Sequence, residues 1–344
     1  MKIKINNKIE FNKKKAPLLI AEVSGNHSGS KKKFLKLINS AFLNGADLVK
    51  IQTYEPIDIT LNKKNDKFKI KNGIWKNRYL WDLYKEACTP FNWHEDAFKM
   101  AKKHNKILFS SPFSIRAVDL LESFNVKIYK ISSFELTDYK LIDYIASKKK
   151  PIIISTGMAN YKEIKNAIRI IEKYHKQIII LHCVSNYPTK LEDTSLASIK
   201  FLKKKFNKYL IGLSDHTKDI ISCIAAIPLG IVAIEKHFKI DDNKTTDSEF
   251  SINSEQLNKL KISIKALDKS LNKRKITFNK QSTILRRSIF ATKNLFLGDK
   301  LNYNNMHSLR PKIGIPAENY FKLIGKKINK NIKKDHPIYL KDLD

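Results

Sequence analysis

The sequence has 344 residues, 42% of them hydrophobic, and a formal net charge of +33, which is enough chain for one large globular domain and a small one. Its 66 Lys and Arg residues are spread along the whole chain, and no apolar run reaches the roughly 18 residues of a membrane helix. We therefore predict a cytoplasmic protein with lysines on solvated faces, and neither a nucleic acid nor a membrane as partner.

Eight short apolar runs recur over most of the chain, each followed by a stretch with helical spacing. They contain Ile, Val and Leu without strict alternation, as in strands that are buried on both faces. The runs are 17–23, 47–53, 106–111, 128–133, 151–156, 178–184, 209–214 and 231–237. Eight strands alternating with helices predict a (β/α)8 TIM barrel, and we assign this catalytic domain to residues 1–275.

The second connection between strands is unusually long. Residues 54–89 form a polar stretch before the next helix is expected to begin. Long connections in compact domains are usually functional or disordered. Trp75, Tyr79, Trp81 and Tyr84 favour an ordered connection that covers another part of the molecule.

Residues 276–344 differ from the predicted barrel in their sequence pattern. Residues 276–284 are polar and predict a linker. Residues 285–344 contain short strand-like pieces and turn signals such as Gly298, Gly314 and Gly325, which predict a separate small β-rich domain.

Polar side chains gather at the ends of the eight predicted strands, where the active site of such barrels lies. Lys50 and Lys130 fall where a strand should be buried, and a buried lysine is costly unless it is paired. An anionic ligand would pair them, together with four small hydroxyls in a site for phosphate and carboxylate. These hydroxyls belong to Ser133, Ser155, Ser185 and Ser214. The alternative is that the lysines form ion pairs with Glu22 and Glu235 inside the barrel.

Two histidines follow neighbouring strands. His216 and His237 come directly after the seventh and eighth predicted strands, so we expect their side chains to meet. Two histidines with a nearby carboxylate, from Glu235 or Asp247, suit a divalent metal. The three cysteines are scattered and form no C-x-x-C pair, which indicates a reducing compartment and argues against a thiolate zinc site.

These strand ends form a pattern that resembles the sialic acid synthase family. The matching strings are IAEVSGNHSGS (20–30), GADLVKIQTY (45–54), FSSPF (109–113), YKISSFE (129–135), STGMA (155–159), HCVSNYPT (182–189), GLSDHT (212–217) and IEKHF (234–238). The tail strings SLRPKIGIP (308–316) and IGKKINKNIKKDHPI (324–338) resemble the antifreeze-like SAF domain of the family. The resemblance covers nearly the whole chain and implies a barrel followed by a SAF domain.

One stretch discriminates within the family. Residues 72–94, NGIWKNRYLWDLYKEACTPFNWH, resemble the pseudaminic acid synthases. The resemblance implies a transferase that condenses phosphoenolpyruvate with 2,4-diacetamido-2,4,6-trideoxy-β-L-altropyranose, giving pseudaminic acid and phosphate. The alternative within the family is an N-acetylneuraminate or legionaminate synthase.

The resemblance also implies roles for single residues. A divalent metal on His216 and His237, Mn²⁺ first and Mg²⁺ or Co²⁺ as alternatives, would polarise the sugar aldehyde. Glu22 would stabilise a cationic centre or move a proton, and Glu235 would orient a metal ligand or water. Phosphoenolpyruvate would bind Lys50, Lys130, Ser133, Ser155, Ser185 and Ser214, and the acetamido-sugar would bind Gln52, Tyr187, Asp247 and Arg310. Arg310 matches an arginine that reaches the partner subunit's active site, which implies a domain-swapped homodimer.

Three other functions compete with this one. A Schiff-base aldolase would use Lys130 or Lys236 and need no metal. A glycoside hydrolase would use Glu22 and Glu235 and need neither the lysine pair nor a metal. A nucleic-acid binder would bind unrelated DNA or RNA tightly and with a steep dependence on salt.

Overall fold

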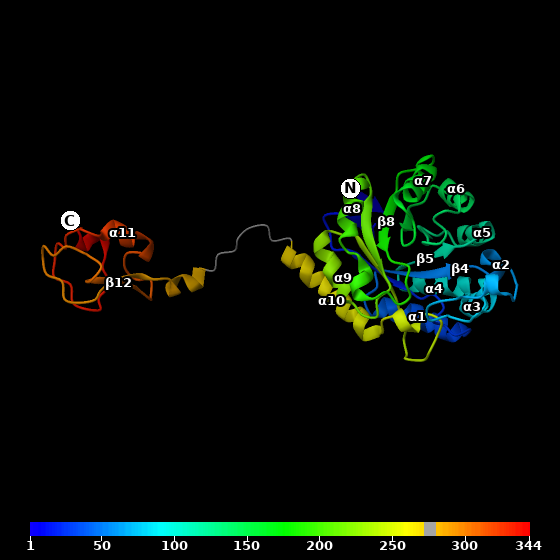
Figure 1. The fold of residues 1–344 in the computed structure, drawn as a ribbon, viewed down its shortest axis with the longest axis horizontal. Helices are drawn as coiled ribbons and strands as arrows, with labels where there is room; N and C mark the ends of the chain where they lie inside the picture. Colours follow the sequence, from blue (N-terminus) through cyan, green and yellow to red (C-terminus); the bar gives the residue numbers. More distant parts are fainter. Residues whose placement is uncertain (272–279) are drawn as a thin grey trace. The chain divides into compact units, whose positions relative to one another are not determined.

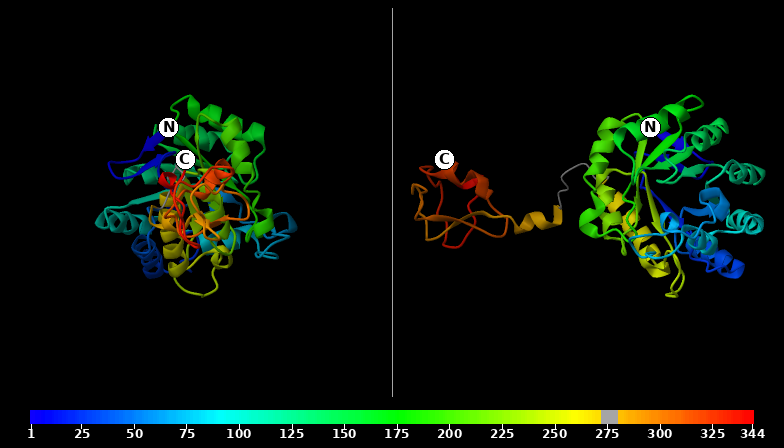
Figure 2. Two further views of the ribbon diagram at one scale, coloured as in Figure 1. Left: turned by 90° about the vertical axis from the view of Figure 1, so that its left-hand side faces the viewer. Right: turned by 45° about the vertical axis from the view of Figure 1, so that its right-hand side comes forward.

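The computed structural model describes residues 1–271 and 280–344. The chain divides into two compact units, Met1–Lys273 and Arg274–Asp344, and each is described here by itself (Figures 1 and 2). Part of the predicted linker, 276–279, lies outside the described residues, and a 3-10 helix follows at Lys280–Leu285. The domain limits predicted from the sequence stay predictions.

The first unit contains a closed barrel of eight parallel strands, which confirms the predicted fold. The strands are β3 (Leu18–Glu22), β4 (Leu48–Thr53), β5 (Ile107–Pro112), β6 (Tyr129–Ile131), β7 (Ile152–Ser155), β8 (Ile178–Cys183), β9 (Leu210–Asp215) and β10 (Ala233–His237). Each strand pairs with the next one along the chain, and β10 pairs with β3 to close the barrel. Nearly every strand residue is buried, which explains why the apolar runs are continuous.

Helices surround the barrel. They are α1 (Lys31–Leu43), α2 (Pro56–Ile59), α3 (Leu80–Ala87), α4 (His94–Lys103), α5 (Ile115–Ser123), α6 (Tyr139–Ser147), α7 (Tyr161–Glu172), α8 (Ser198–Lys205), α9 (Ile221–Ala226) and α10 (Ser254–Leu271). Their apolar stripes face the strands: in α7, for example, Ile164 and Ile168 are buried. The same helix begins with a reciprocal capping box between Asn160 and Glu163, a device worth about 1 kcal/mol.

An N-terminal hairpin closes one end of the barrel. Its strands, β1 (Lys2–Lys4) and β2 (Glu10–Asn12), pair antiparallel and were not expected from the Lys- and Asn-rich sequence. Ile3 and Phe11 pack in one apolar cluster with residues near the starts of the barrel strands, among them Ile20. The N-terminal end of the barrel is therefore filled with hydrocarbon.

The long connection after β4 is ordered, as its aromatic residues predict. It differs from the expected polar loop because it contains two helices, α2 and α3, before α4 begins at His94. His94 is buried and its Nε2 lies 2.8 Å from the hydroxyl of Thr53 in β4. The Thr53 hydroxyl also lies 2.6 Å from that of Ser110 in β5. This network fixes the end of the connection to the barrel.

The second unit is small and has its own core. Strands β11 (Ser288–Ala291) and β12 (Met306–Leu309) pair antiparallel, and a short helix, α11 (Tyr320–Leu323), follows. Its core includes Ile289, Leu301 and Ile338. Among residues 1–271 and 280–344, no helix is both long and apolar enough to cross a membrane.

Candidate active site

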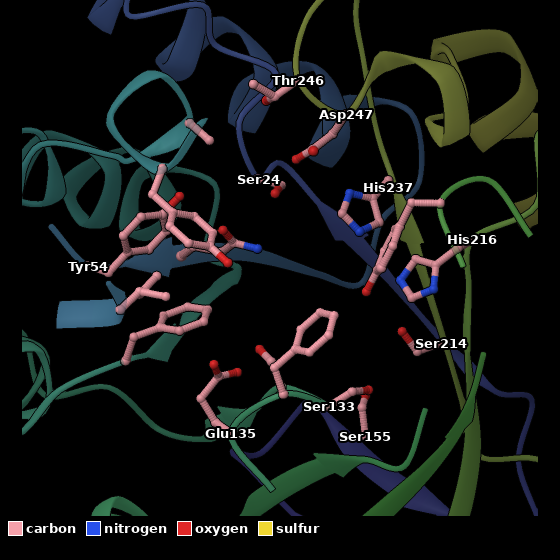
Figure 3. Close-up of a pocket in the computed structure, with 18 of the residues that line it drawn as sticks. Ser24, Tyr54, Ser133, Glu135, Ser155, Ser214, His216, His237, Thr246 and Asp247 are labelled. Atoms are coloured by element: carbon pink, nitrogen blue, oxygen red, sulfur yellow. The ribbon is translucent and has the colours of Figure 1, made fainter. Parts of the chain in front are cut away.

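A cavity of about 530 Å³ lies at the C-terminal ends of the barrel strands, where such barrels carry their active sites. The strand ends form one part of its lining and the long connection after β4 forms another. Eleven of the predicted site residues line it: Lys50, Gln52, Lys130, Ser133, Ser155, Tyr187, Ser214, His216, Glu235, His237 and Asp247. In Figure 3 the two labelled histidines lie on one side of this cavity and Tyr54 on the other.

Two lysines and two glutamates form a buried cluster at the cavity floor. The Lys50 ammonium contacts the Glu22 carboxylate and lies 3.8 Å from Oε1 of Glu235. Lys130 Nζ also lies 3.8 Å from Glu235 Oε1. The ion pairs that the sequence left as an alternative are therefore present. Lys130 has the weaker pairing, because no carboxylate lies closer to it among the described residues.

Burial shifts the pKa values in this cluster. Burial raises the pKa of Glu22 to about 7, against the lowering effect of Lys50. Burial lowers the pKa of Lys130, against the raising effect of Glu235. For Glu235, burial acts to raise the pKa, but the two lysines outweigh it and lower the pKa. Burying these charged groups away from water therefore costs free energy. An anionic ligand that pairs with the lysines would reduce this cost.

Small hydroxyls surround the turn after β7. The backbone N–H of Gly157 donates to the Ser133 hydroxyl at 3.1 Å. A Cβ on Gly157 would lie 2.2 Å from Ser185 Oγ and 2.9 Å from Ser133 Oγ, so a side chain here would displace the hydroxyls. Ser155 Oγ is buried and has no hydrogen-bond partner in the part of the chain that the structure describes. Such an orphan hydroxyl indicates a place for a polar ligand.

His216 and His237 meet at the ends of the paired strands β9 and β10, as their spacing predicts, with ring centroids 5.3 Å apart. Nδ1 of His216 lies 2.9 Å from the carbonyl oxygen of Val184, so a proton on Nδ1 leaves Nε2 as an acceptor. Burial lowers the pKa of His237 well below its ordinary value and keeps it neutral. Its Nδ1 is buried without a hydrogen-bond partner among the described residues.

A buried salt bridge between Lys236 and Asp215 positions His216. The Lys236 ammonium contacts the Asp215 carboxylate and the carbonyl oxygen of Thr217, and the Ser222 hydroxyl donates to Asp215 at 2.6 Å. These contacts hold the turn on both sides of His216. Lys236 does not line the cavity, so among the described residues it is not placed for Schiff-base chemistry there.

Aromatic rings enclose the two histidines. The Tyr187 ring lies 4.4 Å from that of His216, and the Phe250 ring lies 4.7 Å from that of His237. Trp75, from the long connection, packs on Tyr187 at 5.5 Å and donates its indole N–H to the carbonyl oxygen of Thr246 at 2.8 Å. The connection after β4 is thereby attached to the loop after β10.

Three of the predicted site residues, Glu22, Ser185 and Arg310, do not line the cavity. Glu22 is buried behind Lys50, and Ser185 lies beside Gly157. Arg310 is exposed in the second unit. His27, which lies within the matching string 20–30, also stays outside the lining and packs edge-on against Phe34 and Trp93.

Sequence reasoning missed several polar residues of the cavity, among them Glu135, Ser24 and Thr246. Glu135 lines it, and burial raises the pKa of its carboxyl to about 7. Ser24 and Thr246 line the opposite edge, next to Asp247 (Figure 3). The Glu135 Oε2 and Thr246 Oγ1 atoms are buried and, among the described residues, have no hydrogen-bond partner. The only signal for Glu135 was its place inside the string YKISSFE, beyond the strand itself.

The histidine pair fits a divalent cation in part. Imidazoles with free ring nitrogens are suitable ligands, and the bond from His216 to Val184 fixes one ring. Burial acts to lower the pKa of His216, but Cys183 and the Val184 carbonyl outweigh it and raise that pKa, so a cation would have to displace a proton from this ring. No group of three or more His, Cys, Asp or Glu side chains within residues 1–271 and 280–344 forms a complete metal site. The chain therefore offers two ligands, and water or substrate oxygens would supply the others.

Comparison with known proteins identifies the chain. Residues 37–275 match the model of the NeuB family, and residues 286–344 match that of the SAF domain. The pseudaminic acid synthase of Campylobacter jejuni subsp. jejuni serotype O:2 is 38% identical over 328 residues, which cover 94% of this chain and 95% of that protein. The N,N'-diacetyllegionaminic acid synthase of the same organism is 34% identical over 333 residues, which cover 94% and 99%.

A crystal structure of N-acetylneuraminic acid synthetase from Leptospira borgpetersenii has a similar fold. It superimposes with a TM-score of 0.73 and 28% identity, covering 82% of this chain and 94% of that chain. The predicted resemblance to sialic acid synthases is thus confirmed. By its motifs, its barrel and its family match, this chain belongs to the NeuB family and ends in a SAF domain.

Proposed function

We propose that this protein condenses phosphoenolpyruvate with 2,4-diacetamido-2,4,6-trideoxy-β-L-altropyranose to give pseudaminic acid and phosphate. The main support is that one cavity combines two buried lysines, buried hydroxyls without a hydrogen-bond partner among the described residues, and two adjacent histidines. The lysines and hydroxyls suit an anionic phosphate ester, and the histidines suit a metal that polarises an aldehyde acceptor. The 38% identity to a pseudaminic acid synthase, against 34% to a legionaminic acid synthase, favours the altrose sugar.

The anion site would hold phosphoenolpyruvate. Lys130 and Lys50 supply positive charge, and the hydroxyls of Ser133 and Ser155, which line the cavity, supply donors to phosphate oxygens. Ser185 lies beside Ser133 at Gly157, and its hydroxyl would support this site from outside the lining. Ser214 donates to Glu235 at 3.1 Å and would orient that carboxylate. Binding of a multiply charged anion would offset the cost of burying Lys130, whose one ion-pair partner among the described residues, Glu235, lies at 3.8 Å.

The sugar would lie between this anion site and the loops. Gln52, Tyr187 and Asp247 all line the cavity and offer an amide, a hydroxyl and a carboxylate to the hydroxyl and acetamido groups. His216 and His237 would hold a divalent cation, Mn²⁺ first, which supplies Lewis-acid polarisation of the aldehyde. The half-buried Tyr187 ring and the buried Phe250 ring would keep bulk water from that carbon.

The reaction balances without an added redox reagent. C3 of phosphoenolpyruvate forms a bond to C1 of the sugar, whose oxygen takes up a proton, and C2 becomes cationic. Water adds to C2 and loses a proton, which leaves a hydroxyl on C2. The bond between C2 and the phosphate oxygen then breaks, and its electron pair leaves on phosphate. The C2 hydroxyl loses its proton to phosphate, so that C2 becomes the ketone carbon of the product. Glu135 lines the cavity and has a pKa of about 7, so it is suited to take and give these protons near neutral pH. Glu22, whose pKa also lies at about 7, would act through Lys50, which it contacts. Negative charge on Glu235 would stabilise the cationic C2.

The active unit would be a domain-swapped homodimer in the cytoplasm. Arg310 is exposed in the second unit and would complete the sugar site of the other protomer. Mixing inactive His216→Ala and Arg310→Ala proteins tests this, because a swapped heterodimer contains one site that lacks neither residue. Recovered activity supports the swap, and no recovery in verified heterodimers contradicts it.

Phosphate release from phosphoenolpyruvate tests the function. The purified protein is assayed with Mn²⁺ and, separately, the altrose sugar, the legionaminate precursor and N-acetylmannosamine. We expect release with the altrose sugar and its loss in EDTA. Release without any sugar would indicate hydrolysis only, and no release with any of the three from folded protein would reject the synthase assignment.

A further inference from the structure

The cavity has two unlike walls. The strand ends contribute charged and polar groups, whereas the connection after β4 and the end of β5 contribute mostly apolar ones. The apolar wall consists of Tyr54, Ile59, Ile70, Leu80, Leu83 and Phe113. Figure 3 shows Tyr54 across the cavity from His216 and His237. A substrate that fills the cavity therefore presents one end to the reactive groups and the other to hydrocarbon.

The apolar wall is ordered by its own packing. The Tyr54 ring stacks edge-on against the rings of Phe113 and Tyr84 at 5.1 and 6.1 Å. The backbone of Ile70 bonds to that of Asn77 and Arg78, which folds the connection back on itself before Leu80 begins α3. Apolar groups held in this way form a preorganised surface and do not need to be rearranged by a ligand.

We propose that this apolar wall is the subsite for the deoxygenated end of the sugar and that it selects a 6-methyl sugar over its 6-hydroxylated counterpart. The inference rests on the proposed function, because that function places the aldehyde carbon beside the histidines. The far end of the sugar then carries the C6 methyl and the methyl of the C4 acetamido group. The aliphatic side chains of Ile59, Ile70 and Leu80 can form apolar contacts with both of these methyl groups.

The preference for the 6-methyl sugar follows because the side chains of Ile59, Ile70 and Leu80 carry no hydrogen-bonding group. A C6 hydroxyl against Ile59 or Leu80 loses its bonds to water and gains none from the aliphatic groups. A hydrophobic pocket of this kind rejects an added hydroxyl by up to about 100-fold. We therefore expect kcat/KM for the 6-deoxy sugar to exceed that for the 6-hydroxy sugar by about 10- to 100-fold.

The helix α2 offers a matched pair of variants. Ile59 lines the cavity, whereas Ile57, two residues before it in the same helix, is 58% exposed and does not line it. The full-length Ile59→Thr, Ile57→Thr and Leu80→Asn proteins are compared with the wild type. Both sugars, the 2,4-diacetamido-2,4,6-trideoxy sugar and its 6-hydroxy analogue, are assayed by phosphate release.

We expect Ile59→Thr and Leu80→Asn each to reduce the 6-deoxy preference by about fivefold or more, within the range for one apolar contact. Ile57→Thr should leave the ratio unchanged. A wild-type ratio near one, or an unchanged ratio in both folded cavity variants, overturns the subsite. Absence of phosphate release with either sugar in the wild type would instead overturn the proposed function itself.

Discussion

The two ends of the barrel differ in chemistry: one is filled with apolar side chains and the other with charged ones. At the N-terminal end, Ile3 and Phe11 of the hairpin pack on aliphatic strand residues such as Ile20. At the C-terminal end, two strand positions further along β3, Glu22 contacts Lys50 in a buried ion pair. The hydrocarbon end stabilises the fold, whereas the charged end costs desolvation energy, which its internal ion pairs offset in part and ligand binding would offset further. Substitutions at the two ends should therefore have separate consequences.

The largest effect is expected for His216→Ala, at the charged end. Loss of a metal ligand removes Lewis-acid stabilisation of several kcal/mol, so kcat/KM should fall by about 10³-fold or more. Phosphate-release kinetics with Mn²⁺ measure this, with His175→Ala as control because His175 does not line the cavity. Full activity of His216→Ala would remove the histidine pair from the catalytic account.

The next effect is expected for Phe11→Ala, at the hydrocarbon end. Phe11 is fully buried, and truncation of a buried Phe typically lowers the free energy of unfolding by about 3–5 kcal/mol. Denaturant titration measures this, and kcat/KM of the folded protein should not change. Phe201→Ala, at a half-exposed ring in α8, should have a much smaller effect. A large loss of kcat/KM in folded Phe11→Ala would show that the two ends are coupled.

The Glu135→Gln substitution should raise stability while harming catalysis. Because burial raises the pKa of Glu135 to about 7, the folded protein binds a proton that the unfolded chain releases above pH 4.5. This contribution to stability is present below pH 4.5, declines up to about pH 7 and stays lost above it.

The matched measurement is the free energy of unfolding of wild type and Glu135→Gln between pH 4.5 and pH 8. The fall with pH should be smaller in the variant by an amount on the order of 2 kcal/mol, and the fall that remains would come from groups such as Glu22. Parallel curves for the two proteins would mean that Glu135 titrates near its ordinary value.

The smallest effect is expected for Trp75→Phe, which keeps an aromatic ring against Tyr187 but removes the bond to Thr246. One neutral hydrogen bond contributes about 0.5–1.5 kcal/mol, so KM for the sugar should rise by about two- to tenfold. KM for phosphoenolpyruvate should stay constant. Trp81→Phe is the control, since Trp81 does not line the cavity. An equal rise in both KM values would argue against a role confined to the sugar side.

The barrel was predictable because parallel strands are buried on both faces and so leave continuous apolar runs. The same rule identified the polar strand ends, from Lys50 in β4 to His237 in β10. The hairpin was missed because its strands have only three residues each, too few to show a period among lysines. Helix α3 was missed because it buries only Leu83 and Ala87, too few positions to show a helical period within a long polar stretch.

The chemistry of single residues was harder to predict than their place. The sequence left open whether the two lysines form internal ion pairs. The contact of Lys50 with Glu22 and the approach of both lysines to Glu235 answer this. Glu135 lies four residues beyond the end of β6, so strand-end reasoning did not reach it. Its raised pKa depends on burial by loops that no local pattern encodes.

One competition experiment tests the central claim most directly. The protein, phosphoenolpyruvate and Mn²⁺ are mixed with equal amounts of the altrose sugar, the legionaminate precursor and N-acetylmannosamine, and the nine-carbon products are separated and identified by NMR. Because competing substrates are consumed in proportion to their kcat/KM values, we predict pseudaminic acid as the main product. A mixture dominated by either other nonulosonic acid, or the absence of all three, would contradict the account.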